Sequence, residues 1–520
     1  MTSRPTRRDC LSWGLSLGPL ALCPSWVRGQ SALRFSEDPF SLGVASGFPT
    51  SDSVVLWTRL APDPLAAGGG MPDLMVPVRW QVAEDPRMRH LVTGGTALAL
   101  PEDAHSVHVE PVGLRPRRDY WYRFVAGGVE SPVGHTRTAP AEVDALSRLK
   151  LAACSCQMYE HGYYNAYRAM LEDDLDLIVH VGDYIYEGSW GENPVRSHGT
   201  PEARTLDDYR ARYALYKTDP DLRAAHEAFA WIATWDDHEV SNDYANDISN
   251  RDDPPEEFLQ RRAAAYRAYY EHLPLPRAAK PRGPDALIYT ERAYGDLARF
   301  YVLDGRQYRT PHACPPPGRR GGGRVSNCAE LDDPRRTMLG TRQRDWLLGR
   351  LGASRSRWNV LAQQTVMAYM DEDPGPGERF ATDSWSGYPG ERALLMDFLA
   401  ESSVPNPIVL SGDIHAFVVA DLNQRPADLE SPIVAAEFTS TSITSQALPQ
   451  RTLNEMTRGN ANIKLGDAEH RGYVRLDLDR ERARADLVAM QTVRTRDPRS
   501  GVLASFEIEA GRPGVRPVSA

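Results

Sequence analysis

The feature that most constrains the fold is a series of short apolar runs after Asp144 that alternate with longer helical segments. The runs have the length of buried strands, and they span residues 149–153, 175–181, 228–234, 298–303, 359–363, 407–410 and 433–438. Helical segments between them include residues 257–272 and 342–351. Strands that alternate with helices are typical of layered α/β folds, so we predict an α/β domain over residues 145–510.

Polar residues that can bind metals follow five of these runs directly. They lie within residues 154–157, 182–187, 235–239, 304–309 and 411–417. In open α/β sheets, ligands bind outside the carboxyl ends of the strands, so we expect these five segments to meet at one edge. Together they supply Cys, Asp, Tyr, His and Arg side chains. The sequence therefore predicts a ligand site at that edge.

The residue types in these segments indicate a metal centre that acts on phosphate esters. Thiolate, phenolate, imidazole and carboxylate ligands suit a transition metal such as ferric iron. A carboxylate such as Asp183 can bridge two cations, and a pair of metals serves in-line displacement at phosphorus. His238 can donate a hydrogen bond to a phosphate oxygen or a proton to the leaving group. Arg306 and Arg309 carry the planar fork of donors that suits phosphate.

The chain before Pro140 has a different pattern. Residues 53–60, 76–82, 105–111 and 120–125 are rich in β-branched and aromatic side chains and are bounded by turn residues. This spacing favours an all-β sandwich over residues 33–140. Leu114-Arg115-Pro116, shortly before Tyr120, resembles the corner of a fibronectin-type module, so we expect a fibronectin- or immunoglobulin-like domain. Because no cluster of titratable residues stands out here, we expect an accessory domain.

The first 31 residues have the features of an export leader. Arg7 and Arg8 precede an apolar stretch that runs from Leu11 to about Val27 and is interrupted by glycine and proline. Such a stretch suits a cleaved leader better than a membrane anchor. The segment resembles a twin-arginine leader, so we expect the twin-arginine export machinery as a partner and a periplasmic or secreted location. The alternative is a disordered basic terminus.

Composition excludes several other functions. The chain has 60 Lys and Arg residues against 70 Asp and Glu residues, a formal net charge of −10. A mildly acidic protein has no general attraction for nucleic acid, so we expect no stable nucleic-acid complex. Beyond the leader, no stretch is apolar enough to span a bilayer, so we expect no membrane span in the mature protein.

Two other hydrolase classes lack their motifs. The Gly-x-Ser-x-Gly pattern of serine hydrolases is found at Gly14–Gly18, inside the predicted leader. The His238-Glu239 pair lacks the second histidine that a zinc protease helix requires. The sequence therefore gives no support to either class.

The ordered motifs resemble the PhoD-like alkaline phosphatase family. The motifs are Cys156-Gln157, Gly182-Asp183-x-x-Tyr186, Trp235-Asp236-Asp237-His238-Glu239, Asp304-x-Arg306-x-x-Arg309 and Gly412-Asp413-x-His415. The resemblance spans nearly the whole chain after the leader, and the family also includes a phospholipase D of streptomycete type. The Asp183-x-x-Tyr186 spacing is similar to that of purple acid phosphatases, in which the tyrosine binds ferric iron.

The resemblance implies a fold, cofactors and ligands. The fold would be a calcineurin-like metallophosphoesterase sandwich of α/β layers, with one iron (Fe3+) and one or two calcium ions (Ca2+). By motif, the iron ligands would be Cys156, Asp183, Tyr186 and His415. Positions around the neighbouring metals would be Asp183, Asp237, Asp413 and Asn242. Cys156 is preferred to Cys154 because glutamine follows the ligand in the family pattern, and Asp236 could orient a ligand instead of binding the metal.

Cys314 and Cys328 flank a loop rich in proline and glycine. In an exported protein we expect these two cysteines to form a disulfide, with two free thiols as the alternative.

These observations predict an exported, metal-dependent phosphoesterase that hydrolyses phosphomonoesters, phosphodiesters or both, with a small phosphate ester as substrate. His238 and Arg306 are the residues expected to act on the substrate. Two alternatives are a phospholipase D-like phosphodiesterase of the same family and an exported binding protein whose metals only brace the fold.

Overall fold

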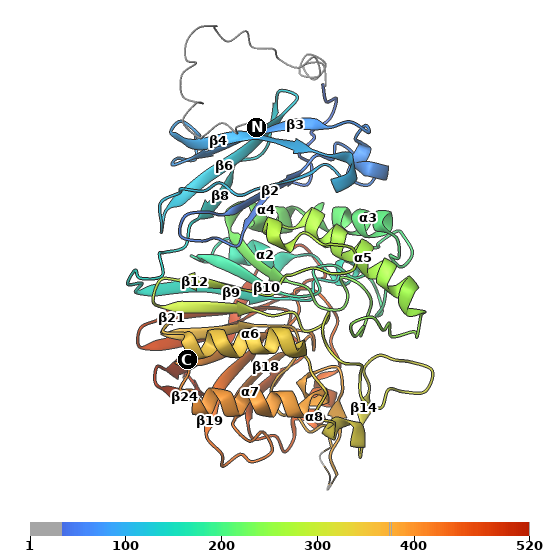
Figure 1. Cartoon of the computed structure of the whole chain (residues 1–520), viewed down its shortest axis with the longest axis vertical. Helices are drawn as coiled ribbons and strands as arrows, with labels where there is room; N and C mark the ends of the chain where they lie inside the picture. The colour runs from blue at the N-terminus through green and yellow to red at the C-terminus, as the bar shows by residue number, and fades with distance from the viewer. Residues whose placement is uncertain (1–33, 374, 376, 519–520) are drawn as a thin grey trace, which may run out of the picture.

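The computed structural model describes residues 34–373, 375 and 377–518. The predicted leader, residues 1–31, lies outside the described residues. The described chain is built from two large sheets, one smaller N-terminal sheet and the helices that cover them (Figure 1).

The larger sheet has ten strands in the order β24-β23-β22-β21-β9-β10-β11-β1-β2-β5. Their bounds are β1 (Val44–Gly47), β2 (Val55–Arg59), β5 (Ser106–Val109), β9 (Arg148–Cys154), β10 (Leu177–Val181), β11 (Ala230–Thr234), β21 (Gly472–Asp479), β22 (Arg482–Met490), β23 (Ser500–Glu509) and β24 (Arg512–Pro517). Strands β9, β10 and β11 run parallel, so their carboxyl ends share one edge. The C-terminal strands β21–β24 extend the sheet as an antiparallel meander.

The second sheet has seven strands in the order β12-β13-β15-β17-β19-β18-β20. Their bounds are β12 (Thr290–Tyr294), β13 (Ala298–Val302), β15 (Trp358–Ala362), β17 (Pro407–Ser411), β18 (Phe417–Asn423), β19 (Ile433–Thr439) and β20 (Ile463–Asp467). Strands β13, β15, β17 and β19 run parallel. A continuous apolar core joins the two sheets, with Leu151 and Ile178 from the first and Phe300 and Ile408 from the second.

Helices form the outer layers. The first sheet packs with α2 (Asn165–Met170), α3 (Leu206–Lys217), α4 (Pro220–Ala228) and α5 (Pro255–His272). The second packs with α6 (Gly340–Ala353) and α7 (Pro389–Glu401), through residues such as Leu347 and Leu395. Other short elements include α8 (Gln450–Thr457) and a two-stranded sheet of β14 (Arg324–Val325) and β16 (Phe380–Ala381). Figure 1 shows α3, α4 and α5 between the N-terminal strands and β10.

The N-terminal strands form a second layer of β-structure. A five-stranded sheet contains β3 (Val76–Ala83), β4 (Leu91–Ala99), β6 (Asp119–Ala126), β7 (Val129–Glu130) and β8 (Gly134–Arg137). It encloses an apolar core with β1, β2 and β5, to which Val78, Tyr122, Val44 and Leu56 belong. Strand β1 also pairs in parallel with β11, so β1, β2 and β5 continue the ten-stranded sheet.

The mixed α/β class predicted from the sequence is confirmed, and each predicted apolar run after Asp144 lies on a strand of one of the two large sheets. The sequence pattern did not indicate β12, β18 or β20–β24, which pair antiparallel and make both sheets mixed. It also did not indicate that the N-terminal strands join the larger sheet through β1. The alternation of apolar and polar residues in the N-terminal strands indicates which face of each strand is buried. It does not indicate which strand lies next to it.

Candidate metal centre

The predicted site residues lie at the carboxyl ends of strands from both large sheets. Cys156 follows β9, Asp183 follows β10, and Asp237 follows β11 in the first sheet. Arg306 follows β13 and Asp413 follows β17 in the second sheet. The two sheets meet here, because Ser155 and Ser442 form an isolated parallel bridge. The topology therefore brings segments more than 200 residues apart to one place.

The backbone at this edge is strained. Cys156, Asp183, Asp413 and His415 have φ angles of 59°, 57°, 67° and 59°, which lie in the left-handed region. Residues with a β-carbon adopt this region only at an energetic cost, and such outliers gather at functional sites. Four such residues near the ends of these strands indicate that the positions of their side chains are maintained despite the cost in backbone energy.

One group of side chains surrounds a single point with mixed donor atoms. Ligand atoms of Cys156, Asp183 and His415 lie within 4.8 Å of one another. The Tyr186 hydroxyl joins them, because it lies 2.9 Å from Asp183 Oδ2 and 2.9 Å from His415 Nε2. His415 Nδ1 donates to the Gln446 carbonyl at 2.7 Å, which leaves Nε2 as the ring nitrogen that faces the group.

Carboxylates extend this group on one side. Two further sets of ligand atoms within 4.8 Å of one another are Asp183, Asp237 and His238, and Asp236, Asp237 and Asp413. Asp183 and Asp237 are each shared between sets, so the sets form one continuous centre. Asp183 Oδ1, Asp236 Oδ2 and Asp237 Oδ1 are buried, and none has a hydrogen-bond partner among the described residues. Buried polar atoms without partners call for an ion or a ligand.

Electrostatics supports the same conclusion. Burial raises the pKa of Asp183 well above its usual range, and the charges of Asp237 and Asp236 raise it further. Burial also raises the pKa of Asp413, with Asp236 adding to the effect. The Cys156 thiol has a raised pKa because of burial and the nearby Asp183. These groups are costly to ionise within the protein alone, and bound cations would reverse that cost.

The donor sets fit the metals that the resemblance implies. Sulfur, phenol, imidazole and carboxylate donors around one point suit a transition metal such as ferric iron. The neighbouring carboxylate oxygens suit a hard cation such as calcium. The fit rests on donor chemistry, on the orphaned oxygens and on the shared Asp183, which can bridge two ions.

Arg306 lies behind the carboxylates, with its side chain fully buried. Its Nε donates to Asp236 Oδ1, while Nη1 and Nη2 donate to Asp383 at 2.7 and 2.8 Å. Its Nη2 lies 3.8 Å from Asp237 and 4.0 Å from Asp413. The guanidinium thus positions carboxylates of the centre, and its expected contact with phosphate stays a prediction.

His238 lies on the partly exposed side of the centre. Its Nδ1 is 2.7 Å from Glu187 Oε2, and its side chain is 13% exposed. Burial lowers the pKa of this histidine, but the charges of Glu187, Asp237 and Asp183 outweigh burial and hold the pKa well above its usual value. A cationic His238 can donate a proton or a hydrogen bond.

Asn242 is less closely tied to the centre than the other predicted ligands. Its backbone N–H donates to Glu187 Oε1 at 2.7 Å. Within the described part of the chain, no hydrogen bond joins its side-chain amide to the carboxylates. Cys154 lies inside β9 and is buried, and Cys156 is the cysteine whose sulfur belongs to the mixed-donor group.

Sequence reasoning missed three acidic residues of this region. Asp243 and Asp383 form a further set of ligand atoms with Asp237. Glu239 accepts backbone N–H groups of Asp183 and Asp236 at 3.2 and 2.7 Å, so it holds the two strand ends together. Glu239 is the last residue of the Trp235–Glu239 motif, and Asp243 directly follows Asn242, so both lie close to a sequence signal. Asp383 has no such signal, because it lies in a loop and not at the end of an apolar run.

The loop between Cys314 and Cys328 borders the same region. The structure joins these two cysteines in a disulfide. A Cβ added at Gly321 would lie 2.8 Å from Asp243 Cβ, and one at Gly322 would lie 2.7 Å from Asp383 Cβ. The loop backbone therefore packs directly against two acidic residues, at a distance that only glycine permits.

None of the described helices has both the length and the apolar character that a membrane crossing requires.

Comparisons with known proteins agree with the geometry. A family model described as PhoD-like phosphatase matches residues 151–487, and one described as its N-terminal domain matches residues 27–140. Alkaline phosphatase D of Bacillus subtilis (strain 168) is 44% identical over 517 residues, which cover 97% of this chain and 87% of that protein. A solved structure described as "Structure of PhoD" superposes with a TM-score of 0.90 at 45% identity, covering 94% of each chain.

Proposed function

The chain belongs to the PhoD-like phosphatase family and is a phosphoesterase of the alkaline phosphatase D type, and we propose that it is exported. We further propose that it uses iron and calcium to hydrolyse phosphomonoesters, phosphodiesters or both. The observation that carries the proposal is the continuous centre in which Asp183 is shared between two sets of ligand atoms and Asp237 among three. A shared carboxylate is the arrangement that holds two cations close together.

In this proposal, iron is held by Cys156, Asp183, Tyr186 and His415. Calcium is held by Asp183, Asp237 and Asp413, with Asn242 as an additional ligand. When bound, these ions supply positive charge that polarises a phosphoryl oxygen and lowers the pKa of water. If iron is bound there, the phenol of Tyr186 and the thiol of Cys156 would give it a visible absorption band.

His238 acts as the proton donor. Glu187 accepts its Nδ1–H at 2.7 Å, which fixes the ring and leaves Nε2 to face the substrate. Burial lowers the pKa of this histidine, but the nearby carboxylates raise it overall, and Glu187 favours the protonated ring through its contact with Nδ1. The ring can therefore give a proton to the leaving oxygen or a hydrogen bond to the phosphoryl group.

Arg306 and Glu239 keep the acidic side chains in place. Arg306 links Asp236 to Asp383 from behind, and Glu239 binds the backbone of Asp183 and Asp236. Both contacts are buried, so water would not stabilise a carboxylate that moved out of place. Their part in the reaction is to hold the ligand geometry.

We also propose the finer architecture that the resemblance implies. Residues 145–510 form a calcineurin-like metallophosphoesterase domain, and residues 33–140 form a fibronectin- or immunoglobulin-like domain. Residues 1–31 form a twin-arginine leader, which places the mature enzyme in the periplasm or outside the cell. The two family models that match separate segments support the division, and a disulfide suits an oxidising compartment.

The test is a parallel assay of one metal-analysed preparation. p-Nitrophenyl phosphate, bis-p-nitrophenyl phosphate and phosphatidylcholine represent a monoester, a diester and a phospholipid. We expect hydrolysis of at least one ester, its loss on chelation, and iron and calcium in the protein. Metal binding without hydrolysis of any ester would favour the metal-braced binding protein instead.

Tyr186→Phe gives a readout that does not depend on turnover. If Tyr186 binds ferric iron, the metal-loaded protein has a visible tyrosinate–iron band that this variant loses. An iron-loaded protein without such a band would remove Tyr186 from the ligand set.

A further inference from the structure

Trp190 is an exposed aromatic side chain at the edge of the metal centre. It lies on the loop after β10 and is 39% exposed. Its ring stacks on the His415 imidazole with centroids 5.5 Å apart and an interplanar angle of 13°. The centroid of the Tyr186 ring lies 6.2 Å from that of Trp190. The indole therefore borders two proposed iron ligands while part of its surface is exposed.

The backbone on either side of Trp190 is held in place. The Trp190 carbonyl accepts a hydrogen bond from His161 Nε2 at 2.8 Å, and His161 Nδ1 accepts one from the Gln446 N–H at 3.0 Å. The Glu192 N–H donates to Gln446 Oε1 at 3.0 Å. Gln446 also accepts the Nδ1–H of His415 through its carbonyl. Gln446 thus couples the Trp190 loop to the metal centre.

Gly191 makes this close fit possible. Its φ of +80° lies in the left-handed region, and an added Cβ would lie 2.5 Å from His161 Nε2 and 2.6 Å from Gln446 Oε1. Gly199, on the same loop, has a similar φ of +68° but no heavy atom within 4 Å of an added Cβ. The two glycines differ in the space around them and share the backbone conformation.

The metal centre opens to solvent on the side that Trp190 borders. Asp413, His415, His238 and Asn242 are partly exposed, whereas Cys156, Asp183, Asp236 and Asp237 are buried. A phosphate ester must present its phosphorus to this open side, so its organic group extends over the rim. The Trp190 ring is a large apolar surface at that rim. A planar group can cover such a ring more completely than a small aliphatic group can.

We propose that Trp190 forms an aromatic subsite for the organic group of the ester and that the enzyme prefers esters with planar, apolar groups. This proposal rests on the proposed function and deepens it by naming a substrate class. Trp190 is a specificity-determining residue, and Gly191 and Gln446 position it.

The test compares phenyl phosphate with methyl phosphate on the metal-loaded, full-length protein. We expect Trp190→Ala to lower the ratio of kcat/KM for phenyl over methyl phosphate about tenfold. Trp190→Phe keeps a ring and should lower the ratio about twofold to threefold. An unchanged ratio in Trp190→Ala, including an equal loss for both substrates, would overturn the proposal.

The two glycines supply a matched pair of variants. Gly191→Ala should displace the Trp190 loop and lower the same ratio at least about threefold, because the new Cβ meets His161 and Gln446. Gly199→Ala introduces the same backbone strain in open space, so its ratio should equal that of the wild type. Equal ratios for the two variants would count against the positioning argument.

Binding of phosphonates separates this proposal from the proposed function. Calorimetry should show that the wild type binds phenylphosphonate more tightly than methylphosphonate and that Trp190→Ala loses the difference. If the preference exists but no ester is hydrolysed, the proposed function fails and the subsite stands. If esters are hydrolysed but phosphonate binding shows no preference, the subsite fails alone.

Discussion

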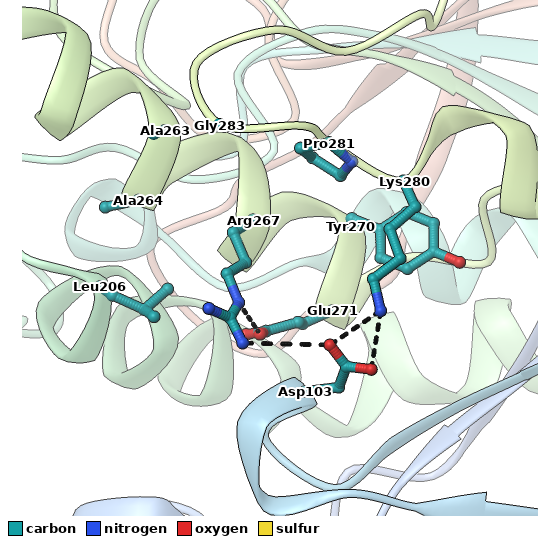
Figure 2. A pocket seen from close by; sticks show the side chains of 10 residues that line it. All are labelled: Asp103, Leu206, Ala263, Ala264, Arg267, Tyr270, Glu271, Lys280, Pro281 and Gly283. Carbon is teal, nitrogen blue, oxygen red and sulfur yellow. Dashed lines mark hydrogen bonds and ion pairs between the residues drawn. The ribbon is translucent and has the colours of Figure 1, made fainter.

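Two regions of this molecule concentrate charged side chains, and they differ in how the charges are balanced. The first is the metal centre. The second, which we name the charged junction, consists of Glu102, Asp103, Arg210, Arg267, Glu271 and Lys280, where the N-terminal strands meet α3 and α5. Most of these residues line or border a cavity of about 530 Å³ (Figure 2). That cavity contains none of the predicted site residues.

In the charged junction, the carboxylates of Glu271 and Asp103 are paired with basic side chains. Glu271 is bound by Arg210 at 2.6 Å and by Arg267 at 3.0 Å, and Asp103 is bound by Lys280 at 2.8 Å. Figure 2 shows Arg267 and Lys280 converging on Asp103. Basic side chains of the protein neutralise these carboxylates, so the region needs no bound ion. Its ion pairs join the N-terminal strands to α3 and α5.

The metal centre is unbalanced by comparison. Its buried carboxylates include three oxygens that have no partner among the described residues, and Arg306 lies on only one side of them. A high density of charged side chains is therefore not enough to identify a binding site. A buried excess of one sign marks it, because such an excess is unfavourable until a counter-ion binds.

The largest effect should come from Asp183→Asn in the metal centre. The substitution removes the charge that two sets of ligand atoms share, so we expect kcat/KM for p-nitrophenyl phosphate to fall at least about 10⁴-fold, roughly 5.5 kcal/mol of transition-state stabilisation. Metal analysis of the same sample should show less bound metal. The matched control is Asp103→Asn in the charged junction, which should retain wild-type activity. Similar activities of the two variants would erase the distinction between the regions.

The next effect concerns stability in the charged junction. The Glu271 side chain is 1% exposed, and Glu271→Gln leaves Arg210 and Arg267 without their carboxylate. Breaking a buried ion pair on one side costs about 3 kcal/mol, so urea denaturation should show that loss in the free energy of unfolding. Activity per folded molecule should not change. A loss of activity at unchanged stability would instead connect the junction to catalysis.

Much of this contrast could be predicted from the sequence. Asp183, Tyr186, Asp413 and His415 follow apolar runs, and the rule that parallel strands present their carboxyl ends at one edge was enough to expect them together. The strand pattern after Asp144 also gave the α/β class. Local residue order was sufficient in both cases because each signal lies within a few residues of a strand.

The remainder depends on contacts between distant segments. Asp383 and Arg306 are 77 residues apart, and no periodicity links them. Arg306 has the donor geometry that suits phosphate, yet its guanidinium donates to Asp236 and Asp383. The sequence did not indicate a role for Trp190 or Gly191. The stacking of Trp190 on His415 is a contact between distant segments. The pairing of β1 with β11 is equally non-local.

A pH-dependent effect on stability is expected beside the charged junction, at His108. His108, on β5, stacks on Tyr270 at 4.3 Å and donates from Nε2 to the Leu273 carbonyl at 2.9 Å. Burial lowers its pKa from 6.5 to about 4, although nearby backbone carbonyls and Asp103 oppose the shift. Because the unfolded chain binds the extra proton between pH 6.5 and 4, acidification through this window destabilises the folded protein.

His108→Phe measures this contribution, because phenylalanine keeps the stacking and cannot be protonated. We expect wild-type stability relative to the variant to fall by roughly 2 kcal/mol between pH 6.5 and pH 4, less than the full linkage value because the ring is only partly buried. Denaturation at several pH values provides the measurement. A difference that stays constant over this range would show that His108 does not titrate as its surroundings imply.

The smallest effect should come from the exposed end of the charged junction. Lys280 is 52% exposed on its side chain, and Asp103 is 22% exposed. Solvent screens such a pair and the lysine gives up side-chain entropy to form it, so Lys280→Met should cost less than about 1 kcal/mol, with a smaller loss at high salt. Both variants, Lys280→Met and Glu271→Gln, remove one charge from the same network, and only burial separates their expected costs. Equal losses in the free energy of unfolding for the two variants would mean that the network acts as one cooperative unit. Its charge balance would then have to be assessed for the whole network instead of pair by pair.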